Sequence, residues 1–484
     1  MPIAFDNSYA RLPERFFALT PPTPVPEPRL VRLNRALAEE LGLDPAWLSG
    51  PEGLAMLAGN AVAEGSTPIA TAYAGHQFGN FVPQLGDGRA ILLGEVIDRS
   101  GRRRDIQLKG AGRTRYSRGG DGRAALGPVM REYIVSEAMA ALGIPTTRAL
   151  AFVLTGARVM RDEILPGAVL TRVASSHIRV GTFQFFAARQ DTEALRALAD
   201  HVIARHHPQA AEAQNRYLGL LEAVIAVQAD LIVRWLLVGF IHGVMNTDNV
   251  SIAGETIDYG PCAFLDAYDP ATVFSSIDTG GRYAYGNQPT MALWNLTRLA
   301  EAMLPLFAEG TDEAVQLAQD ALAGFAPRFQ AGYDAGIARK LGLPGDSEAD
   351  TVLGAEFLGL LGAREADFTL TFRHLARLQA GQADEAPLRA ALAEDPALDD
   401  WLARWRQRSA GTAPGALLSV NPAYIPRNHR VEAAIAAAQE RDDFGPFEEL
   451  LAVLAEPFVE RAVHADYETP PRLEERVLRT FCGT

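Results

Sequence analysis

Three side chains with oxygen ligands lie close together near the middle of the chain. Asp248 and Asn249 are adjacent, and Asp258 follows nine residues after Asn249. Mg²⁺ prefers a few carboxylate or amide oxygens, completed by water and by the phosphates of a substrate. We therefore interpret Asn249 and Asp258 as magnesium ligands, and Asp248 as a base or a group that positions the metal. The alternative is a chance set of acidic loop residues.

The residues around this set follow a known spacing, with one exception. Residues 242–249 read HGVMNTDN, and Asp258 is followed by Tyr and Gly. Protein kinases carry a catalytic loop HRDxxxxN and a later Asp-Phe-Gly triplet. When His242 and Asn249 are aligned with that loop, the catalytic Asp falls at position 244, which is Val here. The pattern predicts metal and nucleotide binding without the usual base for a protein hydroxyl, and it makes His242 a structural residue.

A lysine ends the predicted strand 104–109. Strand alternation places Lys109 on the face opposite to the apolar residues of that strand. A lysine that faces a cleft can hold phosphates and pair with a carboxylate on a neighbouring helix. The predicted helix 128–142 offers Glu132 and Glu137, and because this helix is apolar nearly all round, periodicity does not choose between them. The alternative is a solvated lysine at a sheet edge.

A glycine-rich segment precedes the strands. Residues 84–89 read QLGDGR, and Gly86 and Gly88 would let backbone amides approach a phosphate closely. Taken alone, such a segment is more often a plain turn. The strand pair and the strand-borne lysine that follow it favour a role in nucleotide binding.

Basic residues are concentrated in one region of an otherwise acidic chain. Residues 99–131 contain ten Lys or Arg side chains against two Asp. Within this region, the loop 110–127 combines flexible glycine backbone with arginines, whose planar guanidinium groups suit bidentate phosphate binding. Arg172 and Arg179 are further candidates for anion binding. Solvated surface arginines are the alternative in each case.

The elements that must position these groups change in type along the chain. We expect an irregular arm (1–30), then helices (31–60), then strands (69–73, 89–97 and 104–109) with a hairpin turn at 98–101. A helix (128–142) and further strands within 148–173 should follow. From about 195 we expect mainly helices, and the helix that precedes the catalytic loop should end near 241. This order predicts an α+β, protein-kinase-like two-lobed fold. We divide it into an N-terminal extension (1–67), a β-rich lobe (68–190) and a large helical lobe (191–484).

Composition excludes several other classes of protein. The chain has 484 residues, 48% hydrophobic and 21% charged, as in an ordinary globular protein. Its net charge of −14 argues against general binding of nucleic acid or anionic membranes. Two cysteines, Cys262 and Cys482, are too few for a disulfide scaffold or a zinc site, and the sequence leaves a redox or disulfide role for them open. The apolar run 223–241 is broken by polar residues and reads as a buried helix, and no targeting segment is evident, so we expect a cytoplasmic protein.

Taken together, these motifs resemble the selenoprotein O family of pseudokinase-fold protein adenylyltransferases. The resemblance spans nearly the whole chain. It rests on the segments 73–80 (YAGHQFGN), 84–89 (QLGDGR), 107–114 (QLKGAGRT), 242–249 (HGVMNTDN) and 421–429 (NPAYIPRNH). The family has members with selenocysteine near the C-terminus, whereas this chain has Cys482 there.

The resemblance implies an activity and a set of partners. ATP would bind inverted relative to ordinary kinases, so that AMP is transferred to Ser, Thr or Tyr hydroxyls of proteins and pyrophosphate leaves. The cofactors would be ATP and Mg²⁺, with Mn²⁺ as an alternative metal. We expect a monomer that does not bind nucleic acid or membranes. The competing hypotheses are a γ-phosphotransferase acting on proteins or small molecules, and an inactive ATP-binding scaffold.

The resemblance also assigns roles to individual residues. Lys109 would contact phosphate and pair with Glu132, and Asp248 would be the active-site acid or base. Asn249 and Asp258 would hold the metal, with Asp258 also at the nucleotide. The remaining nucleotide-site residues would be Gly86, Gly88, Arg89, Asp121, Gly122, Arg172 and Arg179.

Overall fold

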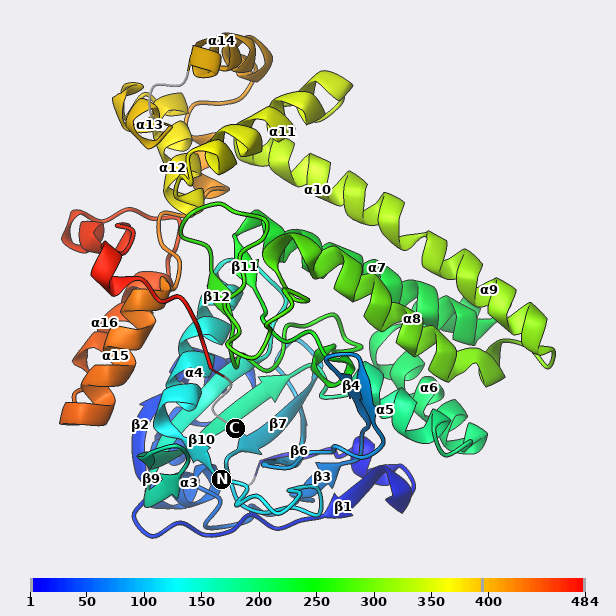
Figure 1. Ribbon diagram of the computed structural model, residues 1–484. Coiled ribbons are helices and arrows are strands. Elements are labelled where there is room, and N and C mark those ends of the chain that lie inside the picture. Colours follow the sequence, from blue (N-terminus) through cyan, green and yellow to red (C-terminus); the bar gives the residue numbers. More distant parts are fainter. Residues whose placement is uncertain (1–2, 393–395, 482–484) are drawn as a thin grey trace.

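One large antiparallel sheet and many helices make up the structure (Figure 1). The computed structural model describes residues 3–392 and 396–481. The strands of the main sheet are, in spatial order, β1 (Phe17–Leu19), β3 (Ile69–Thr71), β6 (Ala90–Ile97), β7 (Arg103–Lys109), β10 (Ile164–Ala174), β9 (Arg148–Met160) and β2 (Arg29–Leu33), and β8 (Ala124–Ala125) pairs with β10. Most of these strands come from the region that the sequence predicts to be β-rich.

The hairpin β6–β7 forms where the sequence predicts it. Asp98 Oδ1 accepts hydrogen bonds from two backbone amides of the turn, each at 2.9 Å. Gly101 has a φ of +80°, a conformation that glycine adopts at no steric cost. The resulting register places Ala90 opposite Lys109. The residues that begin β6 therefore lie beside the lysine that ends β7.

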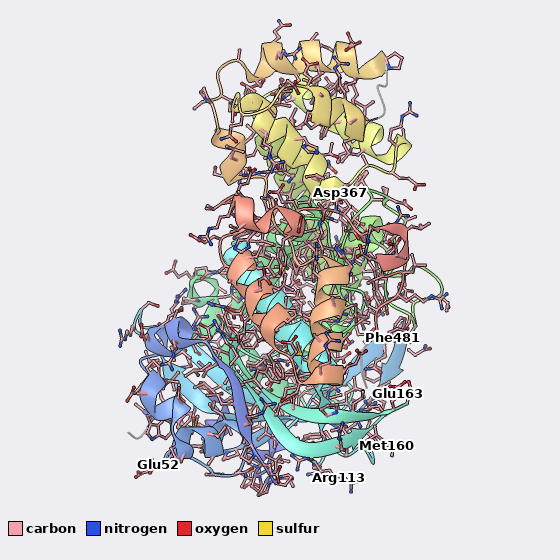
Figure 2. All side chains as sticks on the ribbon, turned by 90° about the vertical axis from the view of Figure 1, so that its left-hand side faces the viewer. Glu52, Arg113, Met160, Glu163, Asp367 and Phe481 are labelled. Atoms are coloured by element: carbon pink, nitrogen blue, oxygen red, sulfur yellow. The ribbon has the colours of Figure 1, made fainter. Side chains whose placement is uncertain are left out.

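Helix α4 (Leu126–Ala141) packs on strands β9 and β10 of the sheet. Its other side is covered by α15 (Asn428–Arg441) and α16 (Gly445–Leu454), which lie beside it in Figure 2. Tyr133 of α4 meets Phe447 of α16 edge to face, with ring centroids 5.6 Å apart. This explains why the helix is apolar nearly all round, and it fixes the position of the carboxylates that α4 carries.

Helices dominate the chain from residue 180 onward. They are α5 (Val180–Ala187), α6 (Thr192–His206), α7 (Arg216–Leu237), α8 (Gln288–Phe307), α9 (Thr311–Ala323), α10 (Phe325–Leu341), α11 (Glu348–Ala363), α12 (Phe368–Gln379), α13 (Ala386–Ala391) and α14 (Pro396–Ser409). Helix α7 packs against both α8 and α10. Helices α11 to α14 form a group that projects away from the sheet, with Asp367 labelled at its base in Figure 2.

The start of the predicted helical region 31–60 is a strand instead. Residues 31–33 belong to β2, which pairs with β9, and helix begins only after Asn34, whose side chain accepts a hydrogen bond from Leu37 N at 3.1 Å. The helices that follow are α1 (Arg35–Glu40), α2 (Pro45–Ser49) and α3 (Pro51–Leu57). Leu33 fits the helical spacing of the residues after it, but its burial comes from pairing with a strand more than a hundred residues away.

Helix α7 ends earlier than the predicted position 241. Gly239 has a φ of +75°, which ends the helix, and Phe240–Ile241 forms the short strand β11. This strand pairs with β12 (Ala263–Phe264). The ladder closes the base of the loop 242–262, which carries the predicted metal ligands, so both ends of that loop are fixed.

The apolar run 223–241 is buried in the helical part of the protein, as predicted. Asp230, which interrupts it, lies on the exposed side of α7 and pairs with Arg328 at 2.7 Å. Among residues 3–392 and 396–481, none of the helices combines the length and the apolarity needed to cross a bilayer.

Candidate active site

Lys109 and Glu132 form a buried ion pair between the sheet and α4. Lys109 Nζ lies 2.5 Å from Glu132 Oε2, at the end of β7. Burial and then the nearby Arg172 lower the pKa of Lys109. Burial alone would raise the pKa of Glu132, but Arg172 and Lys109 outweigh it, so that the net shift is downward. Glu132 is therefore ionised and holds two cations in fixed positions.

Glu137, the other candidate partner of Lys109, has a different environment. Its carboxylate accepts hydrogen bonds from Arg148 Nε and NH2 at 2.9 and 2.7 Å, and from Asn34 Nδ2 at 2.8 Å. It also accepts one from the backbone amide of Ala149 at 2.9 Å. These contacts connect α4 to β9 and to the segment before α1, so Glu137 has a structural position away from Lys109.

Asp258 is the point on which three cations converge. Its carboxylate bonds to Arg172 NH2, and it lies 3.4 Å from Lys109 Nζ and 3.4 Å from Arg179 NH2. Arg172 also reaches Glu132, with Nε 2.5 Å from Oε1. Burial alone would raise the pKa of Asp258, but Arg172, Lys109 and Arg179 hold it well below its ordinary value. The structure thus brings together four residues that were predicted from widely separated parts of the sequence.

Asp258 also has an unusual backbone conformation. Its φ of +62° lies in the left-handed region, which Asp tolerates better than most residues other than Gly. The carbonyl of Asp258 accepts a hydrogen bond from Gly260 N at 2.9 Å, so a tight turn follows. This turn directs the carboxylate toward Lys109 and the arginines.

Asp87 completes the cluster, and the sequence analysis did not single it out. Its Oδ1 accepts a hydrogen bond from Arg179 NH1 at 3.2 Å, and its Oδ2 accepts from Thr71 N and Oγ1 at 2.9 and 2.6 Å. Arg179 also stacks over the ring of Tyr73, 4.5 Å from its centroid. The signal that could have identified Asp87 is its position between Gly86 and Gly88.

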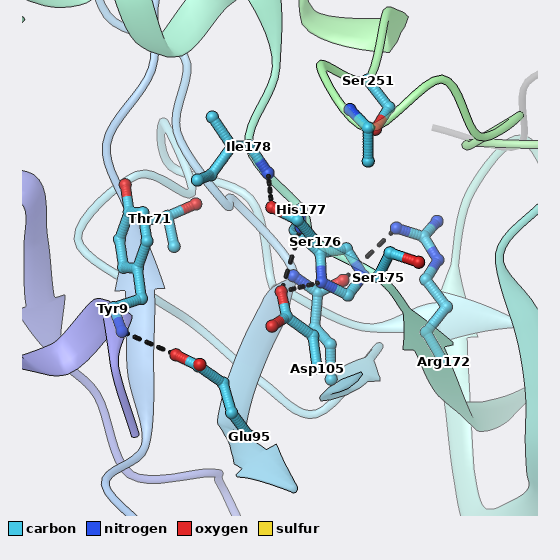
Figure 3. Close-up of polar contacts among 12 residues, drawn as sticks. Tyr9, Thr71, Glu95, Asp105, Arg172, Ser175, Ser176, His177, Ile178 and Ser251 are labelled. Carbon is cyan, nitrogen blue, oxygen red and sulfur yellow. Dashed lines mark hydrogen bonds and ion pairs between the residues drawn. The ribbon is translucent and has the colours of Figure 1, made fainter. Parts of the chain in front are cut away.

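The segment 175–179 joins β10, which carries Arg172 near its end, to α5, and it ends at Arg179. Its middle is fixed by Asp105, whose Oδ2 accepts from His177 N at 3.0 Å and lies 2.9 Å from His177 Nδ1 (Figure 3). Arg205 of α6 approaches the other oxygen of Asp105 at 2.6 Å. All of these side chains are buried. Arg172 contacts Oδ1 of Asp258, and Arg179 contacts its Oδ2.

The catalytic-loop residues Asp248 and Asn249 lie in the short helical turn Thr247–Asn249. Asn249 Nδ2 donates to Val244 O at 3.0 Å, which leaves its Oδ1 as the oxygen available to a ligand. Asp248 Oδ2 accepts from Gln77 Nε2 at 3.4 Å, whereas its Oδ1 is buried without a partner. Burial raises the pKa of Asp248 to about 6.

A hairpin between β3 and β6 covers this loop. It consists of β4 (Gly75–Gln77) and β5 (Asn80–Val82), beside α5 in Figure 1. Its backbone amides donate to the loop, His76 N to Thr247 Oγ1 at 2.7 Å and Phe78 N to Asn246 Oδ1 at 2.9 Å. A Cβ atom on Gly75 would lie 2.8 Å from Asp248 Oδ1, so a larger residue there would displace the carboxylate of Asp248. Residues 73–80, noted in the sequence only as a family motif, therefore form a wall of the site.

His242 fixes the start of the loop to the protein core. It is fully buried, its Nε2 lies 2.8 Å from Ile257 O, and its ring stacks on Trp235 with centroids 5.4 Å apart. This environment matches the structural role that the sequence predicts.

The two glycine-rich segments pack on one another. A Cβ on Gly86 would lie 2.2 Å from the ring of Tyr116, and one on Gly88 would lie 3.0 Å from Tyr116 O. Tyr116 belongs to the Gly/Arg loop, so both glycines are needed for this close approach. Arg89 follows at the start of β6 and is near enough to Lys109 to contribute, after burial and Arg172, to the lowering of its pKa.

Asp121 and Gly122 lie apart from the cluster around Asp258 in their side-chain contacts. Asp121 pairs with Arg161, at 3.0 and 3.1 Å, and its side chain is 41% exposed. Gly122 has a φ of +68°, and a Cβ there would collide with Gly112 O at 2.0 Å. The structure thus gives Gly122 a packing role in the loop and gives Asp121 an ion-pair partner.

The donor set fits a hard divalent cation that is bound partly by a substrate. Asp258 and Asn249 offer oxygen ligands, and the described residues contain no group of three His, Cys, Asp or Glu side chains that could enclose a metal by themselves. Mg²⁺ is usually bound in this way, by one or two protein oxygens together with phosphates and water. Cys262 is buried at the end of the loop, where burial raises the pKa of its thiol to about 12, and Cys482 lies outside the described residues.

The sequence matches one family over most of its length. The family model described as "Protein adenylyltransferase SelO" matches residues 1–455. The "Protein nucleotidyltransferase YdiU" of Rhodopseudomonas palustris (strain HaA2) is 66% identical over 486 residues, and that of Bradyrhizobium sp. (strain BTAi1 / ATCC BAA-1182) is 63% identical over 486. That of Methylorubrum populi is 64% identical over 493 residues. In each case the alignment covers 99% of this chain and 99% of the relative.

Proposed function

This chain belongs to the SelO family of protein adenylyltransferases, and we propose that it transfers AMP from ATP to Ser, Thr or Tyr hydroxyls of proteins, releasing pyrophosphate in a Mg²⁺-dependent reaction. The convergence of Lys109, Arg172 and Arg179 on Asp258 carries this proposal. Three fixed cations beside a metal-ligating carboxylate suit a triphosphate whose charge is redistributed during the reaction.

The cations would bind the phosphates of ATP. Lys109 and Arg172 are held by Glu132, and Arg179 is held by Asp87, so none of them has to be reordered when the nucleotide enters. Preorganised charges stabilise a transition state because their orientation has already been fixed by folding. Arg172 and Arg179 would anchor the departing pyrophosphate, and Lys109 would contact phosphate beside them.

Asn249 and Asp258 would hold Mg²⁺, or Mn²⁺ as an alternative. When bound, the metal would neutralise negative charge on the phosphates. The acceptor oxygen would form a bond to the α-phosphorus as the bond from that phosphorus to the bridging oxygen breaks. The hydroxyl proton would pass to Asp248, whose unpartnered Oδ1 lies beneath the hairpin β4–β5. Val244 contributes nothing to this transfer, which explains how a chain without the usual kinase Asp can be active.

The glycine-rich segments would line the nucleotide. Gly86, Gly88 and Arg89 are supported by their position next to Asp87 and Lys109. Gly122 would shape the Gly/Arg loop through its close contact with Gly112. For Asp121 the support is the family motif alone, since its carboxylate is already paired with Arg161.

The organisation of the chain forms part of the same proposal. We propose a kinase-like pair of lobes, a β-rich one (68–190) and a helical one (191–484), with 1–67 as an extension that adds β1 and β2 to the sheet. Support comes from the order of elements and from the cluster itself, in which Lys109 and Arg172 contact both Glu132 of α4 and Asp258 of the loop 242–262. We further propose a cytoplasmic monomer that acts on proteins and not on nucleic acid or membranes, in keeping with its net charge of −14.

The experiment is a transfer assay with ATP labelled at either the α- or the γ-phosphate, in the presence of Mg²⁺. We expect α-label on protein, including the enzyme itself, and its loss in Asp258→Ala. Label from the γ-position alone would identify a phosphotransferase, and ATP binding without transfer would identify a scaffold. Parallel reactions with the other three α-labelled nucleotides would test the base, since the relatives' name specifies only a nucleotide.

A further inference from the structure

Arg282 lies beside the hairpin that covers the catalytic loop, and it lacks an acidic partner. Its guanidinium packs against the backbone of Gly79 at the tip of the β4–β5 hairpin, where a Cβ would be 3.8 Å from NH1. On its other side it stacks over the ring of Trp294, with Cζ 4.7 Å from the centroid. Nε and NH2 are buried without a hydrogen-bond partner, and in residues 3–392 and 396–481 no carboxylate forms an ion pair with the guanidinium. The guanidinium is thus held between Gly79 and Trp294 as a cation without a carboxylate partner.

The charged groups around Arg282 are engaged elsewhere. The chain has 59 acidic and 45 basic residues, so carboxylates are in excess. Arg298, which stacks on the same indole at 5.2 Å, pairs with Glu301 at 2.6 Å. The nearby Asp278 uses both carboxylate oxygens on backbone amides, those of Arg282 at 2.9 Å and Tyr283 at 2.7 Å. Asp278 therefore stabilises the backbone of the turn 278–283, and its carboxylate does not pair with the side chain of Arg282.

Arg282 lies near the part of the loop that carries Asp248, the residue proposed to take the proton of the acceptor hydroxyl. Tyr283, its neighbour, donates from its hydroxyl to Asn246 Oδ1 at 2.7 Å, two residues before Asp248. The ring of Tyr283 meets Phe78 of the hairpin with centroids 5.2 Å apart. These contacts join Arg282 and the hairpin tip to the part of the loop that precedes Asp248, whereas Lys109 of the phosphate-binding cluster is on β7.

Exposed apolar side chains occur on the hairpin and on the segment that precedes Arg282. Phe81 of β5 is 41% exposed and Ile277, five residues before Arg282, is 57% exposed. An unpaired cation with exposed apolar neighbours suits a polypeptide segment that carries a carboxylate, because one charged group fixes the register and the apolar contacts add affinity.

We propose that Arg282 and the hairpin β4–β5 form the recognition surface for the acceptor protein, and that Arg282 selects segments with an Asp or Glu close to the hydroxyl that receives AMP. This inference rests on the proposed function. Arg282 acts as a specificity-determining residue in it, and its charge has no part in binding ATP.

The test reverses the charge at position 282 of the full-length enzyme and, separately, the charge of the acceptor peptide. Peptides with one Ser, Thr or Tyr and either Glu or Lys at the flanking positions are incubated with α-labelled ATP and Mg²⁺. We expect the wild type to favour the Glu peptides by about tenfold in kcat/KM, the scale of one charge-assisted contact, and Arg282→Glu to reverse the preference. The KM for ATP should stay unchanged in Arg282→Glu. Arg282→Gln should lose the preference without reversing it.

The matched control is Arg298→Glu, which alters the other guanidinium on Trp294 and should keep the preference for Glu peptides. An unchanged preference in Arg282→Glu, or an equal loss of transfer to all peptides with Arg282→Gln also inactive, would overturn the proposal. A wild type that transfers α-label to no acceptor at all would instead contradict the adenylyl transfer itself, so the two failures are distinguishable.

Discussion

Lys109 on β7 and Glu132 on α4 form a buried ion pair, with Nζ and Oε2 2.5 Å apart. The same carboxylate holds Arg172 through its second oxygen, so Glu132 positions two of the three cations that face Asp258. This relationship decides between the two carboxylates that the sequence left open, because Glu137 points to Arg148 and Asn34 instead.

We expect Glu132→Gln and Glu137→Gln to have different effects. Glu132→Gln should lower kcat/KM for AMP transfer on the order of 100-fold, as when one preorganised electrostatic group is lost. Glu137→Gln removes charge from four hydrogen bonds and should destabilise the fold by about 1–3 kcal/mol with little change in kcat/KM. Transfer kinetics and urea unfolding of both variants check this. Equal kinetic losses would show that Glu132 has no special role.

Asp258→Asn should separate nucleotide binding from transfer. In the wild type the carboxylate neutralises Lys109, Arg172 and Arg179, so it competes with the phosphates of ATP when no metal is present. Without that charge, ATP should bind at least as tightly in EDTA as it does to the wild type, while transfer in Mg²⁺ is lost. Isothermal titration in EDTA and in Mg²⁺ measures both. Weaker binding of ATP to Asp258→Asn in EDTA would contradict this account of the cluster.

Asp87 should matter more for the reaction than Asp121. Asp87→Asn weakens the buried contact that orients Arg179, so we expect a loss of roughly tenfold in kcat/KM, the scale of one charge-assisted hydrogen bond. Asp121→Asn removes a half-exposed pair with Arg161 and should change kcat/KM little. The two variants are compared in the same transfer assay. A larger effect at position 121 would support the family-based assignment of Asp121 over the geometry.

Lys340 should make stability depend on pH. It is buried on α10, with Nζ 4.2 Å from the centroid of Phe372, and burial lowers its pKa to about 7 from 10.5. Between these values the unfolded chain binds a proton that the folded chain does not, so stability rises with pH there and is lost as pH falls toward 7. We expect Lys340→Met to be more stable than the wild type at pH 7, and this advantage to shrink by roughly 1.4 kcal/mol per pH unit up to about 10.

Urea unfolding at several pH values measures this difference. Arg339→Met, an exposed neighbour that does not titrate in this range, should give a difference that is independent of pH. A pH-independent difference for Lys340→Met as well would show that Lys340 stays charged in the folded state.

The parts of the site that were predictable are those with local signals. Lys109 ends an alternating strand, and the proposed metal ligands lie within a short motif whose spacing is set by one loop. Helix α4 was predictable because apolar residues on every side indicate a helix that is covered on every side. Each of these signals is contained within about twenty residues.

The parts that were missed depend on long-range contacts. The role of Asp87 depends on Arg179, which is ninety-two residues away. The position of the hairpin β4–β5 over the site depends on its hydrogen bonds to Thr247 and Asn246. The strand β2 was mistaken for helix because its partner, β9, is more than a hundred residues further on. Local periodicity contains no information about such partners, and pairing between distant segments overrides local preference.

The burial of Lys109 has a consequence for chemical labelling. The chain has only two lysines, and both are buried, Lys109 with 8% and Lys340 with 3% of its surface exposed. The other 43 of the 45 basic residues are arginines, which do not react with amine-directed acylating reagents. An acyl phosphate of a nucleotide would therefore find one amine within reach of its phosphates, and the yield of that single adduct would count the active sites in a preparation.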